Sequence, residues 1–268
     1  MTDRPSPTIE DVFCKLDGWR HLPAYRLEPT LAPFFGLFLS DILRARLGIE
    51  THSTIIPEFP LRKDSLPKSA NSETKNDDTS EEEETDNLSV NVDFVAFSPS
   101  LESVYFVELK TDTFSINDGQ IDYLKRARKV NFSSLLSGIN KICKTTNRKQ
   151  KYIHLLHDLE AIGLISFRNI EKEKLYEKTF PKGKPGWSKV FGSGPTLVKP
   201  PSERCVIYIT PNGKTEKLRE AEFQEISFCE IADIVQTHGA FGCMFANYLR
   251  KWKAKAGSEN PSNVRVHK

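Results

Sequence analysis

The chain has 268 residues, of which 38% are hydrophobic and 10% aromatic, and this composition excludes a wholly disordered protein. Five cysteines without close spacing exclude a disulfide framework and a CxxC zinc site. No apolar run is long enough to cross a bilayer, and the first residues, MTDRPSPTIEDVF, lack the apolar core of a signal peptide. We therefore expect a cytoplasmic protein.

The charge is distributed unevenly along the chain. Its net value is +2, but residues 71–87 hold eight acids and one base and so carry −7. The rest of the chain therefore carries +9. A basic body suits a polyanionic partner such as nucleic acid.

The first third of the chain begins with residues 1–27, which show no clear period and are predicted to form an irregular arm. Apolar residues at helical spacing then predict a helix over 30–47, with Pro33 in its first turn and Gly48 ending it. Residues 52–61 read as an edge strand interrupted by two prolines. The polar, acidic stretch 64–87 is predicted to be a flexible loop.

Two strands are predicted next, at 88–97 and 104–110, because apolar residues alternate in both. Ser98 to Ser100 form a Ser-Pro-Ser turn between them, so the two strands should pair as a hairpin. Ser115 and Asp118 are spaced like a helix start, and a helix should follow as far as Lys129.

The remaining pattern is mostly helical. Further elements are predicted as helices at 132–143, 148–162, 227–237 and 240–252, and as a buried strand at Cys205 to Thr210. The predicted organisation is an α/β domain over 28–210, followed by a helical segment with a basic tail over 211–268.

The sequence Val-Tyr-Phe-Val-Glu-Leu-Lys places Glu108 and Lys110 two residues apart on a predicted strand. Their side chains should leave the same face, roughly 6 to 7 Å apart, while Leu109 faces the core. The carbonyl oxygen of Leu109 would then be an additional metal ligand. Asp93 lies on the preceding strand, and a hairpin of suitable register brings it beside Glu108. Such an arrangement can bind Mg²⁺ for phosphodiester cleavage.

These residues resemble the PD-(D/E)XK nuclease superfamily, which carries an acid on one strand and Glu-x-Lys on the next. Here the residues are Val92-Asp93 and Glu108-Leu109-Lys110, and Val92 replaces the proline of the family name. The resemblance covers roughly residues 28–130. It implies a restriction-endonuclease-like core, a mixed sheet flanked by helices. It also implies that Asp93 and Glu108 bind Mg²⁺ or Mn²⁺ while Lys110 assists water activation.

Flanking residues extend this resemblance. Glu58 stands where some members carry a further acid, which makes it a candidate metal ligand. Gln120 and Tyr123 resemble a Gln-plus-Tyr helix in which the Gln orients the site and the aromatic assists. Two of these residues have a plain alternative: Glu58 as an exposed carboxylate, and Tyr123 as a packing residue. Glu28 and Asp41 bracket the first long helix, and we interpret both as solvated helix ends.

A basic cluster on the helix after Lys110 is a candidate phosphate contact, although a wet helix face is the commoner role for such residues. Its members are Lys125, Arg126, Arg128 and Lys129. Trp187 and Phe191 lie in a Lys-rich loop, where they are interpreted as ordinary loop anchors rather than as base-stacking residues.

The sequence thus predicts a metal-dependent nuclease acting on nucleic acid, with DNA favoured over RNA, and with a homodimer as a possible state. The alternative is a non-catalytic module of the same fold that binds nucleic acid or protein, for example in host defence. A second alternative makes the helices from Ser227 onward a DNA-reading, winged-helix-like unit. Their aromatic spacing favours packing onto the core instead.

Overall fold

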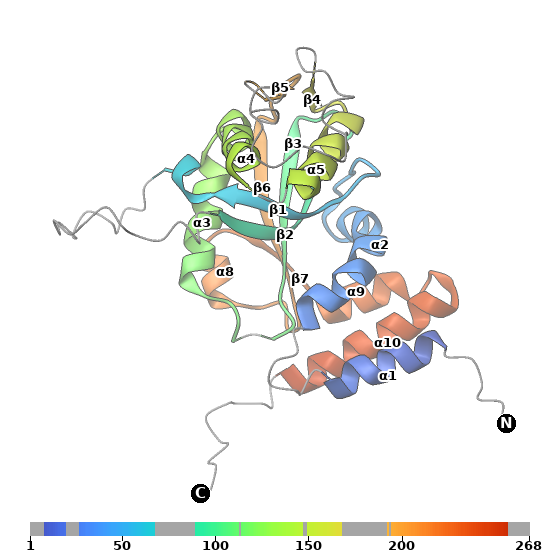
Figure 1. The fold of residues 1–268 in the computed structure, drawn as a ribbon. Coiled ribbons are helices and arrows are strands. Elements are labelled where there is room, and N and C mark those ends of the chain that lie inside the picture. The colour runs from blue at the N-terminus through green and yellow to red at the C-terminus, as the bar shows by residue number, and fades with distance from the viewer. Residues whose placement is uncertain are drawn as a thin grey trace, which may run out of the picture. The chain divides into compact units, whose positions relative to one another are not determined.

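The computed structural model describes residues 8–19, 27–67, 89–112, 114–146, 149–167, 192 and 194–256. Within them the protein is of the mixed α/β type (Figure 1). The chain divides into two compact units. The first comprises residues 1–50, 107–117 and 207–268, and the second comprises 51–106 and 118–206.

The central sheet has five strands in the order β1-β2-β3-β6-β7. It is mixed, because β1 pairs antiparallel with β2 whereas β6 pairs parallel with β7. The strands are β1 (Ile56–Arg62), β2 (Ser89–Phe97), β3 (Ser103–Leu109), β6 (Glu203–Thr210) and β7 (Gln224–Ser227). The predicted hairpin is confirmed, since β2 and β3 are neighbours and Ser98 N–H donates to the Ser103 carbonyl at the turn.

Helix α2 (Leu27–Leu47) of the first unit buries a stripe of large apolar residues, as its spacing predicts. The helix begins three residues earlier than predicted, so Pro33 lies inside it and not in its first turn. A proline there removes one backbone hydrogen bond, and burial of the stripe on either side compensates. Gly48 ends the helix with a φ of 67°, and its N–H donates to the Arg44 carbonyl.

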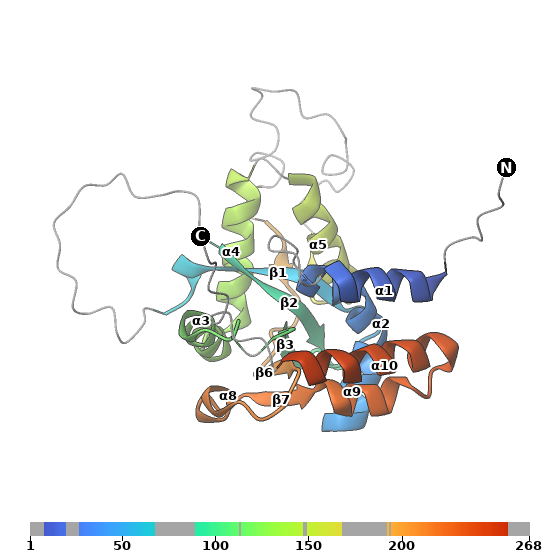
Figure 2. The same ribbon diagram turned by 90° about the horizontal axis from the view of Figure 1, so that it is seen from below.

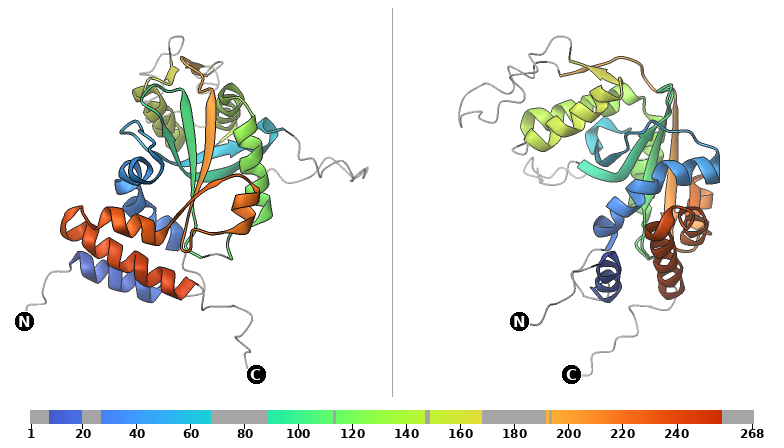
Figure 3. Two further views of the ribbon diagram at one scale, coloured as in Figure 1. Left: turned by 180° about the vertical axis from the view of Figure 1, so that it is seen from behind. Right: turned by 90° about the vertical axis from the view of Figure 1, so that its right-hand side faces the viewer.

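The N-terminal arm, predicted to be irregular, contains helix α1 (Ile9–Trp19), and that prediction was wrong. Figure 2 and Figure 3 show α1 beside α10 (Gly239–Ala256). Phe13 of α1 is fully buried, and its ring lies against those of Phe34, Phe241, Phe245, Tyr248 and Trp252. The aromatic residues of the C-terminal helices therefore pack, as their spacing favours.

Between β6 and the C-terminus, the first unit contains α8 (Glu216–Glu220), β7 and α9 (Phe228–Val235), and α9 contacts both α2 and α10. A capping box begins α9: Ser227 Oγ accepts the Glu230 N–H, and Glu230 accepts the Ser227 N–H in return. Two backbone N–H groups at the start of α9, which have no partner within the helix, are thereby hydrogen-bonded.

In the second unit, helices α4 (Phe132–Thr145) and α5 (Lys149–Ala161) both contact β1. Phe132 is fully buried, and its ring contacts those of Phe59 on β1 and Phe97 on β2. This contact fixes the beginning of α4 on the β1–β2 pair.

The second unit also contains the short 3-10 helix η1 (Lys63–Ser65), helix α3 (Asp118–Lys129) and a two-stranded sheet of β4 (Ile165–Ser166) and β5 (Thr196–Leu197). Of the predicted acidic loop, only residues 64–67 are described. The rest of that loop, Trp187, Phe191 and the basic C-terminal tail lie outside the described residues. None of the described helices is both long and apolar enough to cross a membrane.

Candidate active site

Glu108 and Lys110 lie at the C-terminal end of β3, in the first unit. Lys110 Nζ donates to Glu108 Oε1 at 2.9 Å, so both side chains leave the same face of the strand, as predicted. Leu109 between them is fully buried. The Lys110 N–H donates to the Ile209 carbonyl of β6 at 2.8 Å, and this bond extends the backbone ladder beyond the assigned end of β3.

The Glu108–Lys110 pair is buried, with only 3% and 6% of the two residues exposed. Removing two charges from water costs several kcal/mol for each ion, and their attraction offsets that cost only when the geometry is good. A hydrophobic pair of similar volume would serve the core at least as well. A buried ion pair is therefore weak evidence for a contribution to stability, and we treat the position as a candidate for chemistry.

Glu28, near the start of α2, belongs to the same cluster, although the sequence suggested a solvated helix end. Its Oε2 lies 3.9 Å from Lys110 Nζ. Its Oε1 accepts the Thr111 N–H at 3.3 Å and the Ser115 hydroxyl at 3.4 Å. Its side chain is 28% exposed. Lys110 thus lies between a buried carboxylate and a partly exposed one, and the three side chains together carry a net charge of −1.

The loop after β3 is fixed to this cluster. Ser115 N–H donates to Asp112 Oδ1 at 2.7 Å, and the Ser115 hydroxyl contacts both the Asp112 carbonyl and Glu28. Thr111 is buried. The loop also presents Phe114, which is among the large apolar residues that remain exposed.

Asp93 and Glu58 lie in the second unit, on the β1–β2 pair. The pairs Pro57↔Phe94 and Phe59↔Val92 flank them, so the two acids stand opposite each other in the strand register. Glu58 has a φ of 51°, which non-glycine residues adopt at a cost, and its Oε2 accepts Asn91 Nδ2 at 3.1 Å. Asp93 is half-buried.

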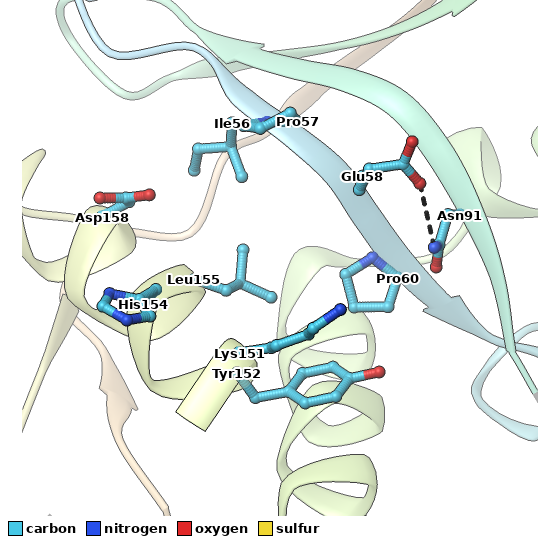
Figure 4. Close-up of a pocket in the computed structure, with 10 residues that line it drawn as sticks. All are labelled: Ile56, Pro57, Glu58, Pro60, Asn91, Lys151, Tyr152, His154, Leu155 and Asp158. Atoms are coloured by element: carbon cyan, nitrogen blue, oxygen red, sulfur yellow. Dashed lines mark hydrogen bonds between the residues drawn. The ribbon is translucent and has the colours of Figure 1, made fainter. Parts of the chain in front are cut away.

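Glu58 and Asn91 also line a pocket of about 460 Å³ between β1, β2 and α5. Figure 4 shows Glu58 turned toward Asn91 on the strands, while the α5 side chains of Lys151, Tyr152 and His154 form the opposite side. Most of the polar groups that line the pocket are solvent-exposed. The chain thus has Glu and Lys side chains in two settings. Glu108 and Lys110 are buried in the cluster that they form with Glu28, which we call the β3 cluster. Glu58 and Lys151 are exposed at this pocket, which we call the α5 pocket.

The remaining predicted residues lie on α3, in the second unit. Gln120 is buried and Tyr123 half-buried, one helical turn apart. In the basic cluster Lys125, Arg126 and Arg128 are half-buried and Lys129 is exposed. Arg126 pairs with Asp122 at 3.0 Å and donates to the Pro67 carbonyl, so its guanidinium already has protein partners. This supports the interpretation of Arg126 as a residue of the helix surface.

The donor chemistry of the β3 cluster suits a hard divalent cation. Glu28 and Glu108 offer carboxylate oxygens, and Mg²⁺ commonly binds through one or two carboxylates together with substrate phosphate oxygens. No group of three or more His, Cys, Asp or Glu side chains able to hold a metal ion occurs among the residues that the structure describes. The β3 residues and Glu28 offer two carboxylates and are not such a group on their own.

Comparisons of this chain with protein-family models, with curated proteins and with solved structures found no significant match.

Proposed function

We propose that this protein is a metal-dependent nuclease of the PD-(D/E)XK type, built on a restriction-endonuclease-like core. The observation that carries the proposal is the buried Glu108–Lys110 pair at the end of β3, with Glu28 beside the same ammonium. An acid-x-Lys triplet alone is common by chance. A triplet that ends a central strand, with both charges buried on one face, is expected by chance much less often.

The proposal requires Asp93 as a second strand-borne acid. The turn bond from Ser98 N–H to the Ser103 carbonyl predicts the register of an unbulged hairpin. Five steps along each strand from that bond lead to Asp93 and to Glu108. The proposal therefore keeps Asp93 and Glu108 as the metal-binding acids that the sequence predicts, with Glu58, opposite Asp93 on β1, as the further acid.

In the proposed reaction Asp93 and Glu108 hold Mg²⁺ or Mn²⁺, with Glu28 and the Leu109 carbonyl as additional oxygen donors. A divalent ion supplies a counter-charge for the phosphate and a more acidic water. Lys110 orients the attacking water and stabilises negative charge on the phosphate, a role for a cation that does not chelate metal. Gln120 and Tyr123 assist positioning, and Lys125, Arg128 and Lys129 contact phosphates.

Nucleic acid is the proposed substrate, with DNA placed ahead of RNA, and the net charge of +9 outside residues 71–87 suits either polyanion. We place the reaction in the cytoplasm. Concerted cleavage of both strands by a protein with one such site would require a homodimer.

The direct test is a Mg²⁺-dependent cleavage assay on DNA and RNA oligonucleotides with three variants, Asp93→Ala, Glu28→Gln and Lys110→Ala. We expect at least a 100-fold loss of rate in each, by analogy with the removal of a group that stabilises developing charge. Lys199→Ala is the matched control, because Lys199 pairs with Glu102 at 3.1 Å on the surface. Equal cleavage by the wild-type protein and all three variants would refute the mechanism.

The alternative is a binding module that keeps the same pair as a structural contact, which the direct Lys110 to Glu108 hydrogen bond also allows. Calorimetric titration with Mg²⁺ and Mn²⁺ separates the two functions. The nuclease should bind metal with an affinity that falls in Asp93→Ala and Glu108→Gln. Metal-independent nucleic-acid binding, with no heat of metal binding, would favour the module.

A further inference from the structure

Phe114 is a large apolar side chain that remains 57% exposed in the loop directly after the candidate active site. Exposing a phenyl ring forgoes roughly 1.5 to 3 kcal/mol of burial, so an aromatic residue held outward beside a site suggests a ligand. Scattered exposed apolar residues are ordinary, and the position of this one is what distinguishes it.

The loop contacts fix where Phe114 lies. Its neighbour Ser115 donates to Glu28 Oε1 at 3.4 Å and is itself fixed by Asp112. Consecutive Cα atoms are 3.8 Å apart, so the Phe114 Cα lies within about 10 Å of the Glu28 carboxylate. Glu28 Oε2 is in turn 3.9 Å from Lys110 Nζ. Phe114 therefore lies at the rim of the cluster, and its exposed ring is accessible to a ligand bound there.

We infer that Phe114 stacks on an unpaired base of a nucleic-acid strand whose phosphate lies at the Glu28–Glu108–Lys110 cluster. The inference rests on the proposed function, and it specifies the substrate as a single strand, a frayed end or a flap. Every base has a face that can stack on a phenyl ring, whereas a base inside an intact duplex has both faces covered. An exposed ring at the rim thus selects unpaired nucleotides without reading their sequence.

The test is binding of fluorescently labelled oligonucleotides, one single-stranded and one a blunt-ended duplex of two complementary strands, with Ca²⁺ replacing Mg²⁺ to prevent cleavage. Stacking on an aromatic side chain is worth about 1 to 3 kcal/mol per base. Phe114→Ala should therefore weaken single-strand binding by about 5-fold to about 140-fold, and should weaken duplex binding less than about 2-fold. Phe114→Trp should restore single-strand binding.

Leu37→Ala is the matched control, since Leu37 is 69% exposed on α2, about 14 Å along the helix from Glu28. It should leave both affinities unchanged. A 2-aminopurine base, placed in turn at each position of the single strand, should report stacking at one position with the wild-type protein and with Phe114→Trp. That signal should disappear with Phe114→Ala.

Equal weakening of both oligonucleotides in Phe114→Ala, or no weakening of either, would overturn the inference while leaving Mg²⁺-dependent cleavage as a separate result. A dimer lost in Phe114→Ala, with strand binding unchanged, would also overturn it and assign the ring to self-association. Conversely, single-strand selectivity that depends on Phe114 in a protein without any cleavage would refute the proposed nuclease and keep the stacking role.

Discussion

The β3 cluster and the α5 pocket use the same kinds of charged residue in opposite ways. In the cluster, Glu108 and Lys110 are buried and bonded to each other at 2.9 Å. At the pocket, Glu58 and Lys151 are exposed on opposite sides. Water solvates the exposed charges at little cost, whereas the buried ones must compensate each other. Among the described residues, the free energy of unfolding should therefore depend much more on the charges of the cluster than on those at the pocket.

The largest expected effect on stability is that of breaking the buried pair. Lys110→Met should destabilise the fold by about 3 to 5 kcal/mol, because the Glu108 carboxylate would stay buried without this ammonium. Urea denaturation followed by circular dichroism measures the change. A loss below about 1 kcal/mol would show that water reaches Glu108, and the contrast between the two regions would fail.

Replacing both partners should have the opposite result. Glu108→Leu combined with Lys110→Met removes both charges, and such exchanges are neutral or stabilise a fold by about 1 to 4 kcal/mol. The same denaturation assay should therefore place the double variant at or above the wild-type protein, although it would be inactive in cleavage. A double variant as unstable as Lys110→Met would show that the site needs its charges in order to fold.

Glu230 is a half-buried carboxylate, so it tests whether the contribution of a charge to stability increases with its burial. Burial disfavours the charged form of Glu230, but hydrogen bonds from Ser227 and the ion pair with Arg46 outweigh it and lower the pKa below its ordinary value of 4.5. The contribution of the Glu230 carboxylate to the free energy of unfolding is therefore complete above pH 4.5, and it is lost as the pH falls through the lowered pKa. Glu230→Gln keeps the capping hydrogen bond but loses the carboxylate charge beside Arg46 and the helix N-terminus, and so should cost about 0.5 to 1 kcal/mol at pH 7. Thermal melts below the lowered pKa should show no difference.

The smallest effect is expected at the pocket. Glu58→Gln should change the free energy of unfolding by less than about 0.5 kcal/mol, because the side chain is exposed and an amide can still accept from Asn91. Chemical denaturation again provides the measurement. A loss comparable to that of Lys110→Met would place Glu58 in a buried charge network and remove the distinction between the two regions.

Elements with a long local pattern were predictable from the sequence. The stripe of α2, the alternation of β2 and β3 and the helical spacing of α4 each cover enough residues for the period to be recognised. Residues 9–19 and 224–227 escaped prediction for two reasons. The first segment forms a helix because Phe13 packs into distant aromatic residues, and the second is too short to show a period.

The candidate site was predictable only where its residues are neighbours in sequence. Glu108 and Lys110 follow from strand alternation, and their hydrogen bond confirms the shared face. Glu28 does not stand out in the sequence, because nothing near it indicates that an N-terminal helix approaches Lys110. The φ of 51° at Glu58 was equally invisible, since nothing in the local sequence predicts a left-handed residue within a strand.

The contacts of Lys110 also constrain when the cluster can form during synthesis. Its ammonium lies near Glu28 and its backbone N–H bonds to Ile209, so both an early and a late segment of the chain must be in place. Such long loops close late in folding. A nascent chain that has not yet released residue 209 from the ribosome therefore lacks the completed cluster.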